Sequence, residues 1–377
     1  MSDAIGNESQ FESTQDAHWK NRKALPGNLV FSKMLGRRVR AGAWADQKIA
    51  TYTKIKEAIE TGRFCDASAL ADYFVDEAKV CYDLYRQWLA DLCRFLSVKG
   101  LTGSEIVAAN QRILENLDLP DGRPFIAKYC WMEFLDEIRE FHSICGREDA
   151  KAALEMLDTF KEDWRRIHDR DVDHCYGLMN EVKMRLGEAS VEEVLRAILL
   201  PLFTWRYSKF DIDKYEWDSA LETLLYVACE AMRGHLVGPA RDGNFELWEE
   251  RDRWVVRFDP CGSGGRSVRG DVIEGTAPRM EAPYNYSVTE KEHDWAWNKK
   301  GVCYYCAHCC ILMEQMPIDA FGYPVRIVTP PTYPEQREAK CTWYMYKDPA
   351  EIPEEYYLRV GRKKPSIFGS QAQGGKP

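Results

Sequence analysis

The chain has 377 residues, of which 45% are hydrophobic and 12% aromatic, and its formal net charge is −9. This length exceeds the usual size of one hydrophobic core, so we expect two substructures, and the negative charge argues against nucleic acid as a partner. No apolar run approaches the ~20 residues of a membrane span and no signal peptide is evident, so we expect a cytoplasmic protein with no membrane partner.

Residues 1–43 are polar and then basic, with little helical periodicity. We expect either an extended arm that wraps a neighbouring subunit of a homo-oligomer or a partly ordered tail. Residues 44–235 show apolar side chains every three to four positions, as in the run from Leu70 to Leu96. This spacing predicts a helical domain, which ends where Gly234 can terminate the last helix.

In residues 236–365 the helical spacing gives way to short segments rich in strand-forming residues. Residues 245–249 and 254–258 read as an antiparallel hairpin, and residues 322–328 and 341–346 as two further strands. We therefore predict an α+β fold, in which a large helical block precedes an antiparallel sheet of about four strands, with every strand after residue 244. Residues 366–377 form a flexible tail in this interpretation.

The densest chemical motif runs from Cys303 to Cys310 and places four cysteines and His308 within eight residues. A Cys-x2-Cys pair such as Cys306 and Cys309 presents two thiolates to one metal ion, and zinc needs further ligands to complete a tetrahedron. We predict that Cys341 and Cys261 supply them. The 13 cysteines then represent reduced thiols and a zinc site, with no disulfide framework.

Other ligand sets stay open. Cys303 or Cys310 could replace either distant cysteine, and a cysteine in a strand is often only a small buried hydrophobe. The spacing of Cys303, Cys306 and Cys309 is also similar to iron–sulfur ligation, but the closing Cys-Pro step is missing.

Three residues are candidates for catalytic roles. His308 lies between two predicted ligands, and it is either a ligand itself or a group that faces the open side of the metal. His235 follows a helix end and is a weaker candidate for proton transfer, because a histidine there also complements the helix dipole. Arg266 closes a glycine-rich loop that could hold a carboxylate or an oxyanion, although the loop could equally be a turn that only carries Cys261.

The order of these elements resembles a known group of proteins. Helices followed by a sheet, with Pro260-Cys261-Gly262, residues 305–309 and a last strand that opens at Cys341, are similar to cysteine-rich vinyl-reductase-type and L-2-amino-thiazoline-4-carboxylate hydrolase-like domains. The resemblance covers roughly the last 200 residues. The cysteine run at 303–310 and the long helical block depart from the pattern, so the resemblance does not identify a substrate.

Together these features predict a zinc-dependent enzyme, a hydrolase or lyase that acts on a small organic acid or aromatic compound, in which zinc polarises a bound group or activates water. The competing interpretation is a small-molecule sensor whose zinc is structural. Four thiolate ligands would favour the sensor, because catalytic zinc keeps one exchangeable position.

Overall fold

The computed structural model describes residues 25–33, 35–211 and 213–366. The predicted arm at 1–43 and tail at 366–377 therefore lie mostly outside the described residues. The described part of the arm is a 3-10 turn, η1 (Pro26–Asn28), followed by an antiparallel hairpin of β1 (Leu29–Ser32) and β2 (Arg37–Arg40). The prediction that every strand follows residue 244 is wrong at this hairpin.

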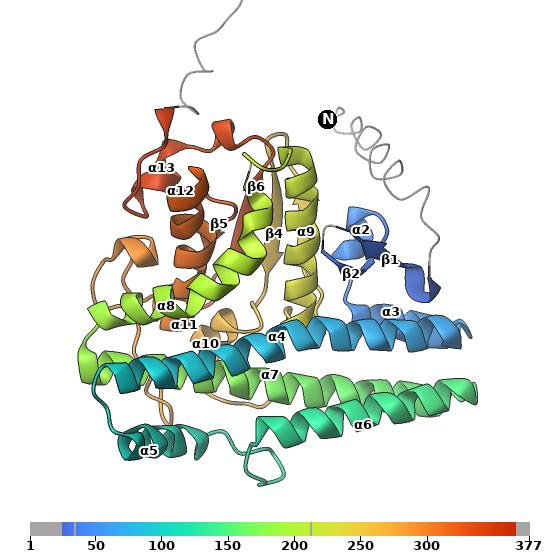
Figure 1. Ribbon diagram of the computed structural model, residues 1–377. Coiled ribbons are helices and arrows are strands. Elements are labelled where there is room, and N and C mark those ends of the chain that lie inside the picture. Colours follow the sequence, from blue (N-terminus) through green and yellow to red (C-terminus); the bar gives the residue numbers. More distant parts are fainter. Residues whose placement is uncertain (1–24, 34, 212, 367–377) are drawn as a thin grey trace, which may run out of the picture.

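The predicted helical block is confirmed, and three long helices form its base (Figure 1). Each of these helices buries an apolar stripe with the predicted three-to-four-residue spacing, so the stripes pack against one another. The helices are α2 (Trp44–Gln47), α3 (Thr51–Glu60), α4 (Phe64–Val98), α5 (Gly103–Leu114), α6 (Ala127–Gly146), α7 (Ala150–Leu186), α8 (Ala189–Arg206) and α9 (Trp217–Gly234), with the 3-10 turn η2 (Tyr207–Phe210) after α8.

The predicted four-stranded sheet is also confirmed. Its strand order is β3-β4-β6-β5 and all its pairs are antiparallel, with β3 (Glu246–Glu249), β4 (Arg253–Phe258), β5 (Ile327–Thr329) and β6 (Cys341–Tyr346). In the β4–β6 pair Phe258 lies opposite Cys341, so the end of β4 meets the start of β6. This register places Cys341 near Cys261, which follows β4 by three residues.

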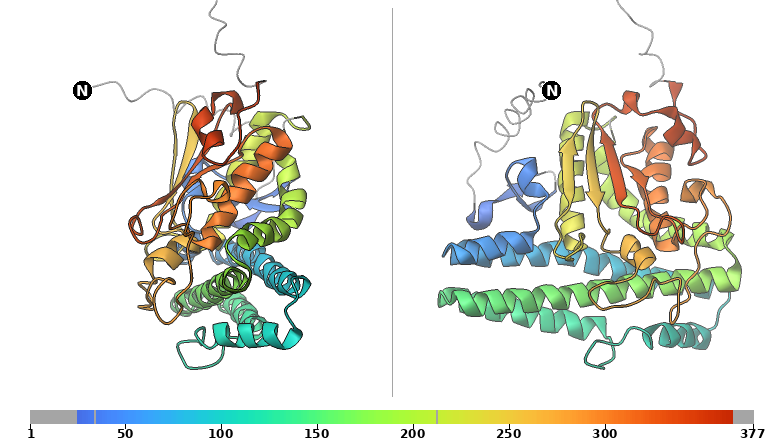
Figure 2. Two further views of the ribbon diagram at one scale, coloured as in Figure 1. Left: turned by 90° about the vertical axis from the view of Figure 1, so that its left-hand side faces the viewer. Right: turned by 180° about the vertical axis from the view of Figure 1, so that it is seen from behind.

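Short helical elements surround the sheet, some next to the helical base and the last at the opposite end of the molecule (Figure 1, Figure 2). They are α10 (Gly264–Arg269), η3 (Asp294–Ala296), α11 (Tyr304–Cys310), the π-helical turn η4 (Ile311–Gln315), α12 (Met316–Phe321), η5 (Pro349–Glu351) and α13 (Glu354–Leu358). Helical backbone continues from α11 through η4 into α12. One contiguous cluster of buried apolar side chains joins the helical base to the sheet, so the predicted substructures share a core.

No helix in the described part of the chain combines the length and the apolar character that crossing a membrane requires.

Candidate functional site

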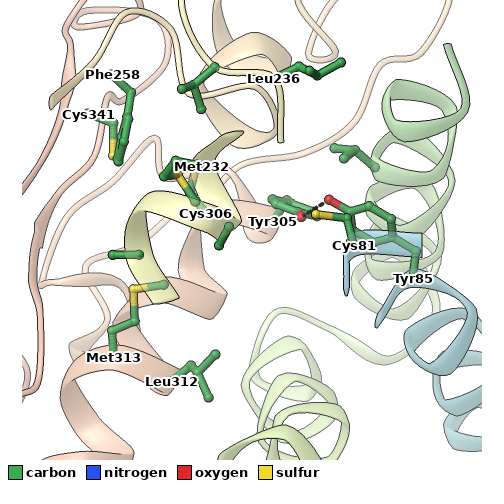
Figure 3. Packing of buried hydrophobic residues seen from close by; sticks show 14 of the residues in the cluster. Cys81, Tyr85, Met232, Leu236, Phe258, Tyr305, Cys306, Leu312, Met313 and Cys341 are labelled. Atoms are coloured by element: carbon green, nitrogen blue, oxygen red, sulfur yellow. Dashed lines mark hydrogen bonds between the residues drawn. The ribbon is translucent and has the colours of Figure 1, made fainter. Parts of the chain in front are cut away.

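The four cysteines predicted to bind zinc come from three segments that approach one another. Cys306 and Cys309 lie one turn apart on α11, Cys261 lies in the loop between β4 and α10, and Cys341 opens β6. A Cβ added to Gly264 would lie 2.3 Å from Sγ of Cys306, so the loop that carries Cys261 passes directly against α11. The glycine of this loop is thus required by a close approach to a thiol. Figure 3 shows Cys306 and Cys341 in this region.

These four thiols also influence one another electrostatically. The pKa of Cys306 is raised well above its usual range by a hydrogen bond with Cys303 and by burial, with contributions from Cys309 and Cys261. Burial raises the pKa of Cys341 well above its usual range, and Cys261 and Cys309 add to the rise. All four are free thiols. Without a cation between them, neighbouring thiols resist ionisation because each thiolate repels the next.

The side chains are near one another but are not arranged around a single point. Among the described residues, no three histidine, cysteine, aspartate or glutamate side chains are placed to hold a metal ion together. Four thiolates form a common structural zinc site, so these cysteines suit zinc in type and number. Their side-chain orientations, however, are not those of a closed site.

Cys303 is a further member of the thiol group and occupies the N-cap position of α11. Although burial opposes ionisation, hydrogen bonds with the Cys306 side chain and with backbone N–H groups at the start of α11 lower the pKa of Cys303.

His308, predicted to be a metal ligand or a group that faces the metal, contacts Cys309 through a hydrogen bond. Nδ1 of His308 lies against the backbone carbonyl oxygen of Tyr305, which can only accept, so Nδ1 carries the proton. Nε2 then has a free lone pair, and it lies 3.4 Å from Sγ of Cys309. Burial lowers the pKa of His308 to about 4, so the imidazole is neutral at pH 7. The geometry defines a thiol that donates to a neutral imidazole.

His235 belongs to a separate buried cluster of two histidines and two tyrosines. Its Nδ1 lies 2.8 Å from Nε2 of His168, and the Tyr85 hydroxyl lies 3.2 Å from each of these nitrogens. The Tyr85 hydroxyl is also 2.9 Å from the Tyr305 hydroxyl (Figure 3). Because Tyr305 immediately precedes Cys306, this cluster connects α4, α7 and α9 to the thiol-bearing helix.

Asp169 fixes the protonation of this cluster. Oδ1 of Asp169 is 2.9 Å from Nδ1 of His168, and the carboxylate also accepts bonds of 2.6 and 3.1 Å from Arg241. Burial opposes its ionisation, but Arg241 and Arg266 outweigh burial and hold the pKa of Asp169 well below its usual range. An ionised carboxylate only accepts, so His168 donates from Nδ1 and accepts at Nε2 from Nδ1–H of His235.

Arg266 lies beside this cluster and not in an open loop. It is 1% exposed, and its Nη2 donates to Oδ1 of Asp173 at 2.6 Å and to the carbonyl oxygen of Asp169 at 3.1 Å. The charge of Arg266 is therefore already compensated by carboxylates of α7. The glycine-rich loop delivers this arginine to α7 while it delivers Cys261 to α11.

His168, Tyr85 and Tyr305 are not among the predicted site residues. The signal for His168 is the run of charged side chains around it on α7, where Arg165, Asp169 and Asp173 occupy a buried helix face and need partners. The partner of His168 is 67 residues away in sequence, so spacing along the chain cannot reveal the contact.

No protein-family model, curated protein or solved structure matches the chain.

Proposed function

We propose that this protein is an enzyme, a hydrolase or lyase of small organic acids or aromatic compounds, and that Cys261, Cys306, Cys309 and Cys341 bind one zinc ion. The observation that supports the proposal is that four free thiols from three segments lie near α11 and influence one another. The resemblance of the last 200 residues to hydrolase-like domains points to the same class.

Zinc binding requires these thiols to lose their protons and turn towards one point. Metal binding drives such ionisation, because a bound cation lowers the pKa of a coordinating thiol. When bound, zinc polarises a ligand or activates water if a coordination position stays open, and closes the site structurally if four thiolates fill it. His308 is placed to hold a proton beside Cys309 in either case.

The contact between Cys309 and His308 favours a second candidate function, a hydrolase that needs no metal. The Cys309 thiol donates to an imidazole whose tautomer is fixed by the Tyr305 carbonyl, which is the arrangement of a nucleophile, a base and an orienting group. Sγ of Cys309 would attack the acyl carbon of an ester or amide while its proton moves to Nε2 of His308. The imidazolium would then protonate the departing alcohol or amine, and water would hydrolyse the remaining thioester to the acid and the free thiol.

Metal quantification on the purified protein separates the two candidates. The zinc proposal predicts about one zinc per chain, a loss of most of that zinc in Cys309→Ser and Cys341→Ser, and full zinc in the control Cys65→Ser, whose thiol is exposed. Full metal content in Cys309→Ser and Cys341→Ser would refute the zinc site.

Activity then tests the class of protein. With substrates drawn from small aromatic and heterocyclic esters, amides and carboxylates, His308→Ala should lower turnover about 100-fold or more if His308 transfers a proton. Turnover that survives zinc removal but not Cys309→Ser would support the metal-free candidate. Zinc with four sulfur ligands and no turnover would support the structural-zinc sensor.

A further inference from the structure

Arg206, the last residue of α8, lacks a counterion. Among residues 25–366, positions 34 and 212 aside, no hydrogen bond or ion pair reaches its guanidinium. Burial lowers the pKa of Arg206, and Arg326 and Arg37 act in the same direction, while Tyr207 and Glu230 oppose them. A half-buried guanidinium that faces other positive charges is costly unless an anion joins it.

Arg326 also lacks a counterion among the described residues, and it is more deeply buried than Arg206. It is 3% exposed, and its guanidinium carbon lies 5.7 Å from the ring centre of Tyr207 and 5.1 Å from that of Trp343. Its Nη1 has only the sulfur of Met313 at 4.0 Å, and its Nε is buried with no hydrogen-bond partner in the described structure. Aromatic faces stabilise a cation but leave its N–H donors unfilled.

The ion pairs formed in this interior by described residues go to two neighbouring arginines. Arg37 pairs with Glu230, and Arg233 pairs with Glu77. Burial and the adjacent Arg233 lower the pKa of Arg40 to about 10. Of five arginines in this region of the described structure, two pair with a carboxylate and three do not, in a chain whose net charge is −9. The arginines are Arg37, Arg40, Arg206, Arg233 and Arg326, and the carboxylates are Glu77 and Glu230.

An aromatic surface continues from these two guanidinium groups. Phe203 stacks on Tyr207 with ring centres 5.8 Å apart, and on Phe321 with ring centres 5.6 Å apart. Phe203 and Phe321 are half-buried, so part of each ring is accessible. A ligand that filled the arginine donors would therefore meet apolar ring surface beside its charged group.

We propose that Arg206 and Arg326 bind the carboxylate of a small organic acid whose aromatic or apolar body packs against Phe203, Tyr207 and Phe321. Guanidinium groups match carboxylates through paired N–H donors, and the rings accept an apolar body. The bound acid would be the substrate of the proposed enzyme, and only this last step rests on the proposed function. Cys309 lies close to the same surface, since its thiol raises the pKa of Tyr207 and is influenced by Arg326.

Isothermal titration calorimetry with sodium benzoate, benzamide and inorganic phosphate tests the site on the full chain. We expect benzoate to bind, and both benzamide and phosphate to bind at least about 10-fold more weakly, because one lacks the charge and the other the apolar body. Equal affinity for benzoate and benzamide would overturn the role of the arginines. Equal affinity for benzoate and phosphate would overturn the role of the rings.

Arg206→Gln and Arg326→Lys should each weaken benzoate binding by about 10- to 100-fold, whereas Arg147→Gln, at an exposed position, should leave it unchanged. Without ligand, Arg206→Gln should match or exceed the wild-type melting temperature, because it removes a charge that is buried without a counterion. Unchanged benzoate affinity in Arg206→Gln, or a lower melting temperature that marks a structural role, would refute the proposal. Calorimetry requires no turnover, so benzoate binding by a chain without zinc or activity would refute the proposed function alone.

Discussion

Replacing Asp169 with Asn tests whether this carboxylate holds the charged groups around the histidine cluster. The substitution preserves the shape of the side chain and removes only its charge. Asp169 accepts two hydrogen bonds from Arg241, one from Arg165 at 3.1 Å and one from His168. Its side chain is 3% exposed, so water cannot replace the lost charge.

The expected loss of stability follows from the partners that Asp169 leaves behind. Removing one member of a buried ion pair costs roughly 3–5 kcal/mol, because the remaining charge is uncompensated. Asp271 moderates this cost, since its carboxylate lies 3.6 Å from Arg165 and 3.8 Å from Arg241. We therefore expect Asp169→Asn to lower the free energy of unfolding by about 3 kcal/mol, at the lower end of that range.

Urea unfolding followed by circular dichroism measures this change. The control is Glu155→Gln, which removes an exposed carboxylate from the same helix and should change the free energy of unfolding by less than about 0.5 kcal/mol. If Asp169→Asn costs less than about 1 kcal/mol, its carboxylate does not anchor the buried arginines and the assignment of the His168 tautomer loses its basis.

Two further predictions concern acid stability and the thiol loop. Burial lowers the pKa of His174 to about 4 from an ordinary 6.5, so the unfolded chain takes up a proton first as the pH falls. The free energy of unfolding should therefore decrease by about 2 kcal/mol between pH 7 and pH 5 through this residue. Urea unfolding of His174→Gln should show a smaller decrease over the same pH range. Identical pH profiles of the variant and the wild type would contradict the lowered pKa of His174. Gly264→Ala places a Cβ 2.3 Å from Sγ of Cys306 and should destabilise the fold by about 1–3 kcal/mol and lower zinc content. Gly103→Ala, which meets no atom within 4 Å, serves as its control, and equal melting temperatures of the two variants would argue against the close approach.

The elements that the sequence predicted well are those with local patterns. The three-to-four-residue spacing in residues 44–235 reflects which face of each helix is buried, and the alternation at 245–258 reflects a strand pair joined by a short turn. The hairpin of β1 and β2 was missed because its arginines resemble a solvated basic tail. In the structure Arg37 pairs with Glu230 of α9, and Arg40 donates to backbone carbonyls of Asp46 and Ile49.

The sequence indicated which cysteines lie in the candidate site, but it did not indicate most of the polar side chains around them. A Cys-x2-Cys pair is a local signal, and Cys261 and Cys341 lie at ends of strands whose pairing could be anticipated. The contact of His168 with His235 depends on how α7 crosses α9, which no spacing in the chain encodes. Arg266 was assigned to a ligand because its loop is glycine-rich, whereas Asp173 four residues after Asp169 on a buried helix face was the better indicator of its partners.

X-ray absorption at the zinc edge on the purified protein tests the central claim most directly. The proposed site predicts one zinc per chain with sulfur neighbours at about 2.3 Å, and loss of that signal in Cys309→Ser. A preparation without zinc, or zinc surrounded only by nitrogen and oxygen, would contradict the proposal that Cys261, Cys306, Cys309 and Cys341 form a metal site.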